Sequence, residues 1–160
     1  MNDKRAELLD QIWRAQDTAY DLMCEYDSLP HHYGAHMLYQ AEAHLIDLIA
    51  LHPDITITDL ANILRKTPSA CSQIVRKLRA KGWVEQIRNE ENNRQYNLRL
   101  TDEGQKVYQD HADFDRNCQA LTFEKLTRFS DEELAVYLSV QKRINEAYQD
   151  DVRRSREYFN

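Results

Sequence analysis

A run of polar side chains between positions 69 and 76 has the spacing and the chemistry to recognise the edges of base pairs. Ser69, Ser72, Gln73 and Arg76 recur at steps of three and four residues, so a helix would place them on one face. Glutamine can pair with adenine through two hydrogen bonds, arginine can do the same with guanine, and serine can donate or accept. Side chains near the start of a helix in the major groove reach the bases. The run therefore indicates a surface that reads duplex DNA.

Basic residues follow this run. Lys77, Arg79 and Lys81 are expected to contact phosphates, which position a protein on DNA without reading its sequence. Arg88 and Arg94 lie in a later charged segment, and an arginine at a hairpin tip suits the negative potential of the minor groove. For any one of these residues, the alternative is an ordinary solvated surface charge. The candidate DNA-binding residues are Thr67, Ser69, Ser72, Gln73, Arg76, Lys77, Arg79, Arg88 and Arg94.

The charge of the chain is unevenly distributed. The whole sequence has a formal net charge of −6, which by itself disfavours a nucleic-acid partner. Between Arg65 and Lys106, however, ten Lys and Arg residues stand against five Asp and Glu residues, whereas the remainder holds eleven against twenty-two. A basic segment of +5 within a chain whose remainder carries −11 is expected where one surface faces DNA. A solvated helix face is the alternative explanation.

The elements that must position these residues predict a helix-turn-helix followed by a hairpin, the wing. Thr58 is a suitable N-cap for the first helix, because its hydroxyl can accept a backbone N–H. Thr67 caps the second helix, and Pro68 at its first position gives up only an N–H that has no partner there. Gly82 is expected to end that helix in a left-handed conformation. The wing strands are expected at 83–88 and 95–100, with the turn at 90–93.

Long helices are expected on both sides of the winged helix. An amphipathic stripe without Gly or Pro predicts the first helix, and a capping box of Ser130 and Glu133 predicts the start of the last one. Thr101 caps the helix between the wing and that box. The remaining expectations are a helix at 3–26, a loop at 28–34, a helix at 36–51, a strand stub at 55–57 that could pair with the wing, and a helix from 101 to 126.

The fold class that follows is mainly α with a small β-wing. Residues 1–35 and 105–160 are expected to form a helical dimerisation region, because a long amphipathic helix near a chain end often finds its partner in a second subunit. Residues 36–104 are expected to form the winged helix-turn-helix DNA-binding domain.

The segment LANILRKTPSACSQIVRKLRAKGWVEQ and the wing after it resemble the multiple-antibiotic-resistance regulator (MarR) family of bacterial transcription factors. The most specific matches are Leu78, Gly82, Val84, Arg94, Leu100, Thr101 and Gly104. The resemblance implies a homodimeric winged helix whose first and last helices interlock between subunits. It also implies a repressor that binds palindromic operators and is released by an effector. Asn92 stands where the family wing commonly carries an Asp that would orient Arg94.

The sequence leaves the effector open between a small organic molecule, a metal ion and an oxidant. Trp13, Tyr20, Tyr26, Tyr33 and Tyr39 could line a pocket for an organic ligand, although aromatic residues at helical spacing also build cores. The resemblance to a zinc-sensing branch of the family implies a candidate zinc site at His32, His44, His111 and Asp115, with Asp115 where that branch would have a second His. His111 and Asp115 have the i, i+4 spacing that can bind one ion. Polar or interface histidines are the alternative.

The three cysteines, Cys24, Cys71 and Cys118, are expected to be free thiols. Cys24 lies among tyrosines and is the candidate for redox sensing, whereas Cys71 falls on the inward stripe of the second short helix. A reactive cysteine needs exposure and a lowered pKa, neither of which a sequence shows.

Several classes of protein are disfavoured. No apolar run approaches the roughly 20 residues of a membrane span, and no signal peptide is apparent, so we expect a cytoplasmic protein. No phosphate-binding Gly-rich loop, nucleophile elbow or HExxH motif is present, so we expect no enzyme activity and no cofactor apart from the possible zinc. A winged helix that binds only another protein is the remaining competitor.

Overall fold

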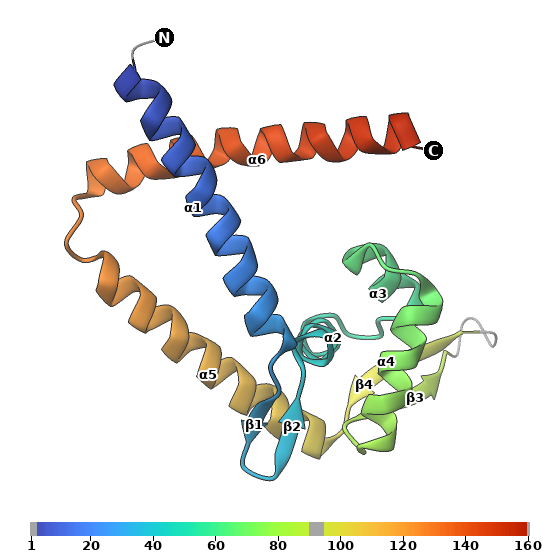
Figure 1. The fold of residues 1–160 in the computed structure, drawn as a ribbon. Coiled ribbons are helices and arrows are strands. Elements are labelled where there is room, and N and C mark those ends of the chain that lie inside the picture. Colours follow the sequence, from blue (N-terminus) through green and yellow to red (C-terminus); the bar gives the residue numbers. More distant parts are fainter. Residues whose placement is uncertain (1–2, 90–94, 160) are drawn as a thin grey trace. The chain divides into compact units, whose positions relative to one another are not determined.

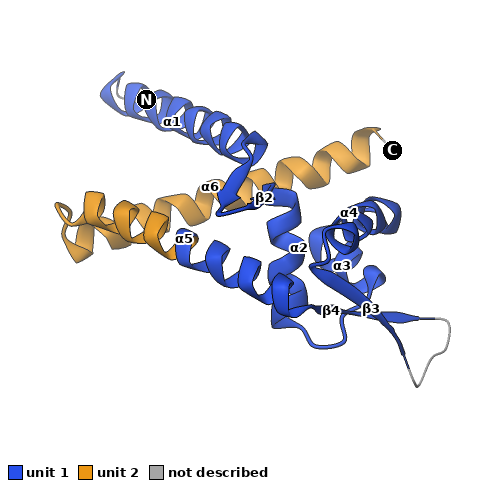
Figure 2. Ribbon diagram, turned by 90° about the horizontal axis from the view of Figure 1, so that it is seen from below, with its two compact units in different colours: residues 1–114 blue, residues 115–160 orange. Residues whose placement is uncertain are grey.

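The computed structural model describes residues 3–89 and 95–159. The chain divides into two compact units, residues 1–114 and residues 115–160 (Figure 2), and each is described by itself. The first unit contains the elements α1 (Asp3–Ser28), β1 (His31–Tyr33), β2 (His36–Leu38), α2 (Gln40–Leu51), α3 (Ile57–Leu64), α4 (Pro68–Ala80), β3 (Val84–Arg88), β4 (Tyr96–Leu100) and the first half of α5 (Asp102–Leu126). The second contains the rest of α5 and α6 (Asp131–Phe159).

The hydrophobic core lies between Leu38 and Val107. In Figure 1, α2, α3 and α4 gather with β3 and β4 around this core. Each of these helices buries one stripe of its surface, as the three- and four-residue spacing of its apolar positions predicts. The fully buried side chains include Leu45, Ile46, Leu60, Val75, Leu78 and Leu98. The core therefore holds the two short helices and the wing together, and the fold is the mainly helical winged helix that the sequence predicts.

The turn between α3 and α4 follows the local signals of the sequence. Thr67 caps α4, because its hydroxyl accepts a hydrogen bond from the backbone N–H of Ala70 at 3.2 Å, and Pro68 occupies the first turn. Arg65 takes a left-handed conformation with φ of 52° and ends α3. Gly82, with φ of 78°, follows the end of α4, where only glycine adopts this conformation without steric cost. The predicted start and end of α4 are confirmed.

The cap of α3 lies two residues earlier than the sequence suggested. Thr56, rather than Thr58, is the N-cap, and its hydroxyl accepts from the backbone N–H of Asp59 at 3.2 Å. The Asp59 carboxylate accepts from the backbone N–H of Thr56 at 2.9 Å. This reciprocal pair needs an acidic residue three positions after the cap. Thr56 has Asp59 there and Thr58 has Ala61, which explains the shift.

Replacing Thr56 with alanine is expected to destabilise the protein by about 1 kcal/mol. The hydrogen bonds from Thr56 lower the pKa of the Asp59 carboxyl group. A carboxyl whose pKa is lowered on folding adds stability above its unfolded-state pKa, and this stability is lost as the pH falls through the folded-state pKa. Urea unfolding at pH 7 and at acidic pH should therefore show a smaller deficit for the variant at acidic pH. The exposed Thr58, changed to alanine, is the control, and an equal loss there would contradict the assignment.

Residues 31–38 form a hairpin, so the expected loop at 28–34 and the expected helix start at His36 were wrong. Strands β1 and β2 pair antiparallel, with His31 opposite Leu38 and Tyr33 opposite His36, and Gly34 supplies the turn with φ of 59°. Helix α2 begins only at Gln40. Its first turn is closed by the carboxylate of Glu42, which accepts from the backbone N–H of Tyr39 at 3.1 Å.

The wing is an antiparallel pair in which Val84 lies opposite Leu100 and Arg88 lies opposite Tyr96. The predicted pairing of the strand stub with the wing is confirmed at two residues, because Thr56 bridges to Asn97 and the N–H of Leu98 donates to the Ile55 carbonyl at 2.8 Å. The third residue of the expected stub, Ile57, instead begins α3. The predicted turn at 90–93 lies outside the described residues.

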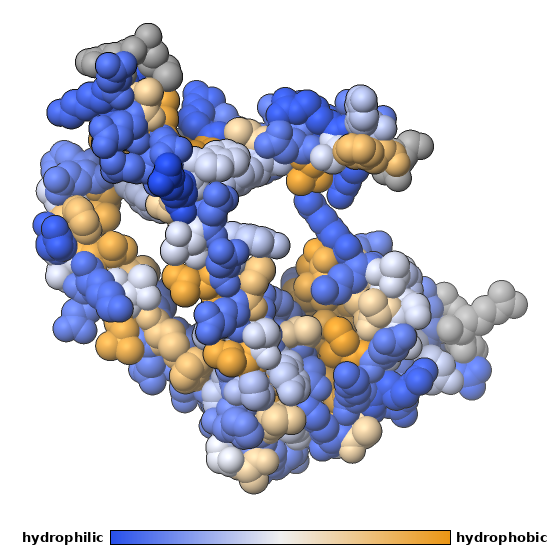
Figure 3. Space-filling model, viewed as in Figure 1, coloured by the Kyte–Doolittle hydropathy of each residue, from blue (hydrophilic) through white to orange (hydrophobic). Residues whose placement is uncertain are grey.

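The long helices carry many apolar side chains that the chain itself leaves exposed. Neither α1 nor α6 contains a buried residue. The predicted capping box of α6 is confirmed, since Ser130 and Glu133 exchange hydrogen bonds of 2.9 and 3.2 Å. On the face shown in Figure 3, hydrophobic residues lie along α5 among hydrophilic ones. Within residues 3–89 and 95–159, every helix is too short or too polar to cross a membrane.

Candidate nucleic-acid interface

Helix α4 presents two faces of opposite chemistry. Cys71, Val75 and Leu78 are buried in the core. Ser69, Gln73 and Arg76 are exposed on the opposite side, and Ser72 is half-buried beside them. Positions 69, 73 and 76 share one face of a helix, whereas positions 71, 75 and 78 share the other. The candidate base-reading side chains thus lie together on the exposed face of α4, and the opposite face of the helix packs in the core.

The candidate phosphate contacts flank this face. Lys77 and Arg79 are exposed on either side of it, and Thr67 is exposed at its start. The guanidinium of Arg79 donates to the side-chain oxygen of Gln86 on β3 at 2.7 Å. Arg88 is exposed at the end of β3, and Arg94 lies outside the described residues. The helix and the wing strand are therefore linked directly through one of the candidate side chains.

Lys81 departs from the expected phosphate contact. Its ammonium nitrogen lies 2.8 Å from both carboxylate oxygens of Glu42 and donates to the Met37 carbonyl at 3.0 Å. The Glu42 side chain is only 7% exposed, so its charge is largely withdrawn from water. Sequence reasoning missed Glu42. The available signal was its position on the apolar stripe of α2, in step with Leu45 and Ile49.

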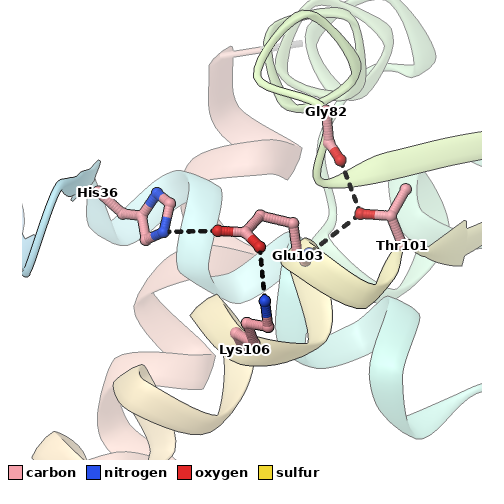
Figure 4. A network of polar contacts seen from close by, with 6 residues as sticks. His36, Gly82, Thr101, Glu103 and Lys106 are labelled. Carbon is pink, nitrogen blue, oxygen red and sulfur yellow. Dashed lines mark hydrogen bonds and ion pairs between the residues drawn. The ribbon is translucent and has the colours of Figure 1, made fainter.

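A second polar network fixes the base of the wing to the start of α5 (Figure 4). The Thr101 hydroxyl donates to the Gly82 carbonyl at 2.6 Å and accepts from the Gly104 N–H at 3.0 Å, which confirms Thr101 as a cap. Glu103 binds Lys106 at 3.0 Å and His36 of β2 at 2.9 Å. These partners, with Lys106 contributing most, lower the pKa of the Glu103 carboxyl group.

Residues 38–95 match the family model described as the MarR family. This segment of the chain is therefore similar to the MarR-family winged helix. The match covers α2, α3, α4 and the wing as far as residue 95, which includes every candidate DNA-binding residue. No curated protein sequence matches the chain.

Solved structures of MarR-family proteins share the fold over almost the whole chain. The chain is 24% identical to FabT of Streptococcus pneumoniae, solved in complex with DNA, with a TM-score of 0.65 and coverage of 94% of this chain and 99% of FabT. It is 19% identical to the zinc-responsive ZitR of Lactococcus lactis, with a TM-score of 0.74 and coverage of 88% and 99%. Another MarR-family transcription regulator gives a TM-score of 0.76 at 19% identity, with coverage of 94% and 99%.

The candidate zinc ligands of the first unit differ in burial and in their partners. His111 is buried, its Nδ1 lies 2.8 Å from the Tyr33 hydroxyl, and its Nε2 lies 4.0 Å from an Asp47 oxygen. His32 and His44 are exposed, and Asp115 belongs to the second unit. Among the residues that the structure describes, no group of three His, Cys, Asp or Glu side chains is placed to hold a metal ion.

The five aromatic residues proposed to line an effector pocket occupy different environments. The rings of Tyr26 and Tyr33 both contact His31 edge-on, with centroids 4.7 and 6.4 Å away. Trp13, Tyr20 and Tyr39 are exposed. The hairpin tyrosine Tyr33 thus belongs to a cluster with His111 and Phe114 on α5, which is consistent with the alternative that aromatic residues here build a core.

The cysteines differ sharply in access. Cys71 is fully buried, and burial raises the pKa of its thiol. Cys24 is exposed, and a hydrogen bond with it raises the pKa of the Tyr20 hydroxyl.

Iodoacetamide should therefore modify Cys24 at least about a hundredfold faster than Cys71 in the folded protein, because Cys71 reacts only after local opening. Mass spectrometry of tryptic peptides gives both rates, and labelling in urea supplies the control in which the two cysteines become equally accessible. Equal rates without urea would show that α4 is not held in the core as described.

Proposed function

We propose that this protein is a MarR-family transcription regulator that binds double-stranded DNA through α4 and the wing. The observation that carries the proposal is the exposed face of α4. Ser69, Gln73 and Arg76 are presented together on a helix whose opposite face is buried. The segment from Arg65 to Lys106 is also the basic part of an acidic chain. The similar protein FabT was solved with DNA, which supports the same use of the fold here.

We further propose that the protein acts as a homodimer on a palindromic operator. Helices α1 and α6 contain no buried residue, yet α1 exposes large apolar side chains at Leu8, Leu9, Ile12, Leu22 and Met23, and α6 exposes them at Val136, Tyr137, Leu138, Val140, Val152, Tyr158 and Phe159. Apolar surface of this extent marks an association surface. A second copy of the chain would cover this apolar surface. It would also place the two copies of α4 in positions related by a two-fold axis. In this proposal the bound dimer represses transcription and a small-molecule effector releases it.

The test is selection of bound sequences from a random DNA pool, followed by affinity measurements at several salt concentrations. We expect an inverted repeat with half-sites about one helical turn apart, and an affinity that falls steeply as salt rises because Lys and Arg side chains displace counterions. If no sequence is enriched, or if binding ignores salt, the winged helix serves another partner, such as a protein.

Zinc and catalysis are not part of this proposal. The zinc-responsive behaviour belongs to ZitR, and in this chain the described His, Cys, Asp and Glu side chains do not converge on a metal site. The family consists of transcription regulators, and no catalytic step is assigned to any residue.

A further inference from the structure

The side chain of Lys81, the C-cap residue of α4, contacts three residues of the same chain. Lys81 donates to both oxygens of the Glu42 carboxylate at 2.8 Å and to the Met37 carbonyl at 3.0 Å. Its ammonium nitrogen also lies 4.5 Å from the centre of the Trp83 ring, within the range of a cation–π interaction. The side chain of Glu42 is 7% exposed and that of Lys81 is 30% exposed. The ammonium group is thus engaged by the protein itself.

These partners lie far from Lys81 in the sequence. Met37 is on β2 and Glu42 is in the first turn of α2, so the end of the candidate reading helix is joined to an element outside the α3–α4 pair. Glu42 is fixed in turn, because it also accepts from the backbone N–H of Tyr39 at 3.1 Å. An ion pair with satisfied hydrogen bonds and little solvent holds its groups more closely than a pair at the surface.

Trp83, the residue that links Gly82 to the wing, is fixed from two further sides. The His36 ring meets the Trp83 ring at 86° with centroids 5.5 Å apart. Helix α5 approaches so closely that a Cβ on Gly104 would lie 1.9 Å from the Trp83 carbonyl oxygen. The contacts of Trp83 with His36 and with α5 therefore hold the end of α4 and the start of β3 in place.

We propose that Lys81 and Glu42 are positioning residues for DNA recognition, which rests on the DNA-binding function proposed above. The pair sets the angle of α4 against α2 and the place where the wing begins, so that the base-reading face and the wing engage the duplex together. Lys81 acts through Glu42, without touching a phosphate, because both carboxylate oxygens already bind its ammonium group.

The experiment measures DNA affinity against salt for Lys81→Met, Glu42→Gln, the double variant and the matched control Lys77→Met. The probe is the duplex recovered by random selection, and circular dichroism together with urea unfolding establishes the folded fraction of each variant. We expect Lys81→Met and Glu42→Gln each to weaken binding about tenfold with the salt slope of the unaltered protein. The double variant should be no weaker than either single one, because all three lose the same pair. Lys81→Arg should recover part of the affinity.

Lys77→Met should instead lower the salt slope by about one, as expected of a lost phosphate contact. If Lys81→Met lowers the slope in the same way while Glu42→Gln has no effect, Lys81 is a phosphate contact and the inference is wrong. If both variants bind like the unaltered protein once corrected for folded fraction, the pair serves stability alone and the inference is also wrong. If the unaltered protein itself binds no DNA, the proposed function fails first.

Discussion

Gly104→Ala is expected to destabilise the protein by about 3 kcal/mol, the upper part of the range for overpacked sites. An added Cβ would lie 1.9 Å from the carbonyl oxygen of Trp83 and 2.8 Å from its carbonyl carbon. These are backbone atoms, so no side-chain rotation can relieve the overlap, and α5 must move away from the base of the wing. Urea unfolding followed by circular dichroism measures the loss of stability.

Gln105→Ala, at the neighbouring exposed position of α5, is the matched control and should change stability by less than about 0.5 kcal/mol. The same two variants also test the close contact between α5 and the Trp83 backbone. A Gly104→Ala protein with unaltered stability would show that α5 and Trp83 are not in the close contact described here.

The double variant Gln73→Ala/Arg76→Ala is expected to lose sequence discrimination by at least a factor of about thirty. Each good bidentate contact with a base contributes about 1–3 kcal/mol of discrimination, and both side chains are exposed on the face of α4 opposite the core. Competition between the selected duplex and random duplex measures the effect directly. Binding to random DNA should persist, because the phosphate contacts remain.

Arg65→Ala is a suitable control within the same basic segment, since Arg65 is exposed in the turn before α4 and is outside the predicted base-reading set. It should weaken binding to both duplexes alike or leave both unchanged. If discrimination survives loss of Gln73 and Arg76, then α4 does not read bases and the assignment of the candidate face is wrong.

The sequence predicted the elements whose signals are local. Each predicted helix boundary depends on residues that act within a few positions of it, and the structure confirms these boundaries. They are marked by Thr67 with Pro68, by Gly82, by Thr101, and by Ser130 with Glu133. The wing strands were expected on either side of the polar turn at 90–93, and both lie within one residue of the expected limits.

Features that depend on distant residues were not predicted. The hairpin at 31–38 was taken for loop and helix because each strand has only three residues, too few for periodicity to show. Nothing in the neighbourhood of Lys81 indicates that its partner is Glu42, 39 positions earlier. A lysine near basic residues at the end of a DNA-binding helix favours a phosphate contact, and only the folded chain reveals the buried carboxylate that binds it.

The confinement of the core to residues between Leu38 and Val107 has a consequence for the concentration at which this protein works. Among the described residues, every buried apolar side chain lies between Leu38 and Val107, whereas α1 and α6 would gain burial when a second copy of the chain binds in the proposed dimer. The thermal midpoint of these two helices should therefore rise with protein concentration, while that of the winged helix should depend on it far less. At low protein concentration, chains in the proposed model would have a folded winged helix while α1 and α6 were not yet ordered. Formation of the dimer would then set the protein concentration at which the proposed operator is bound.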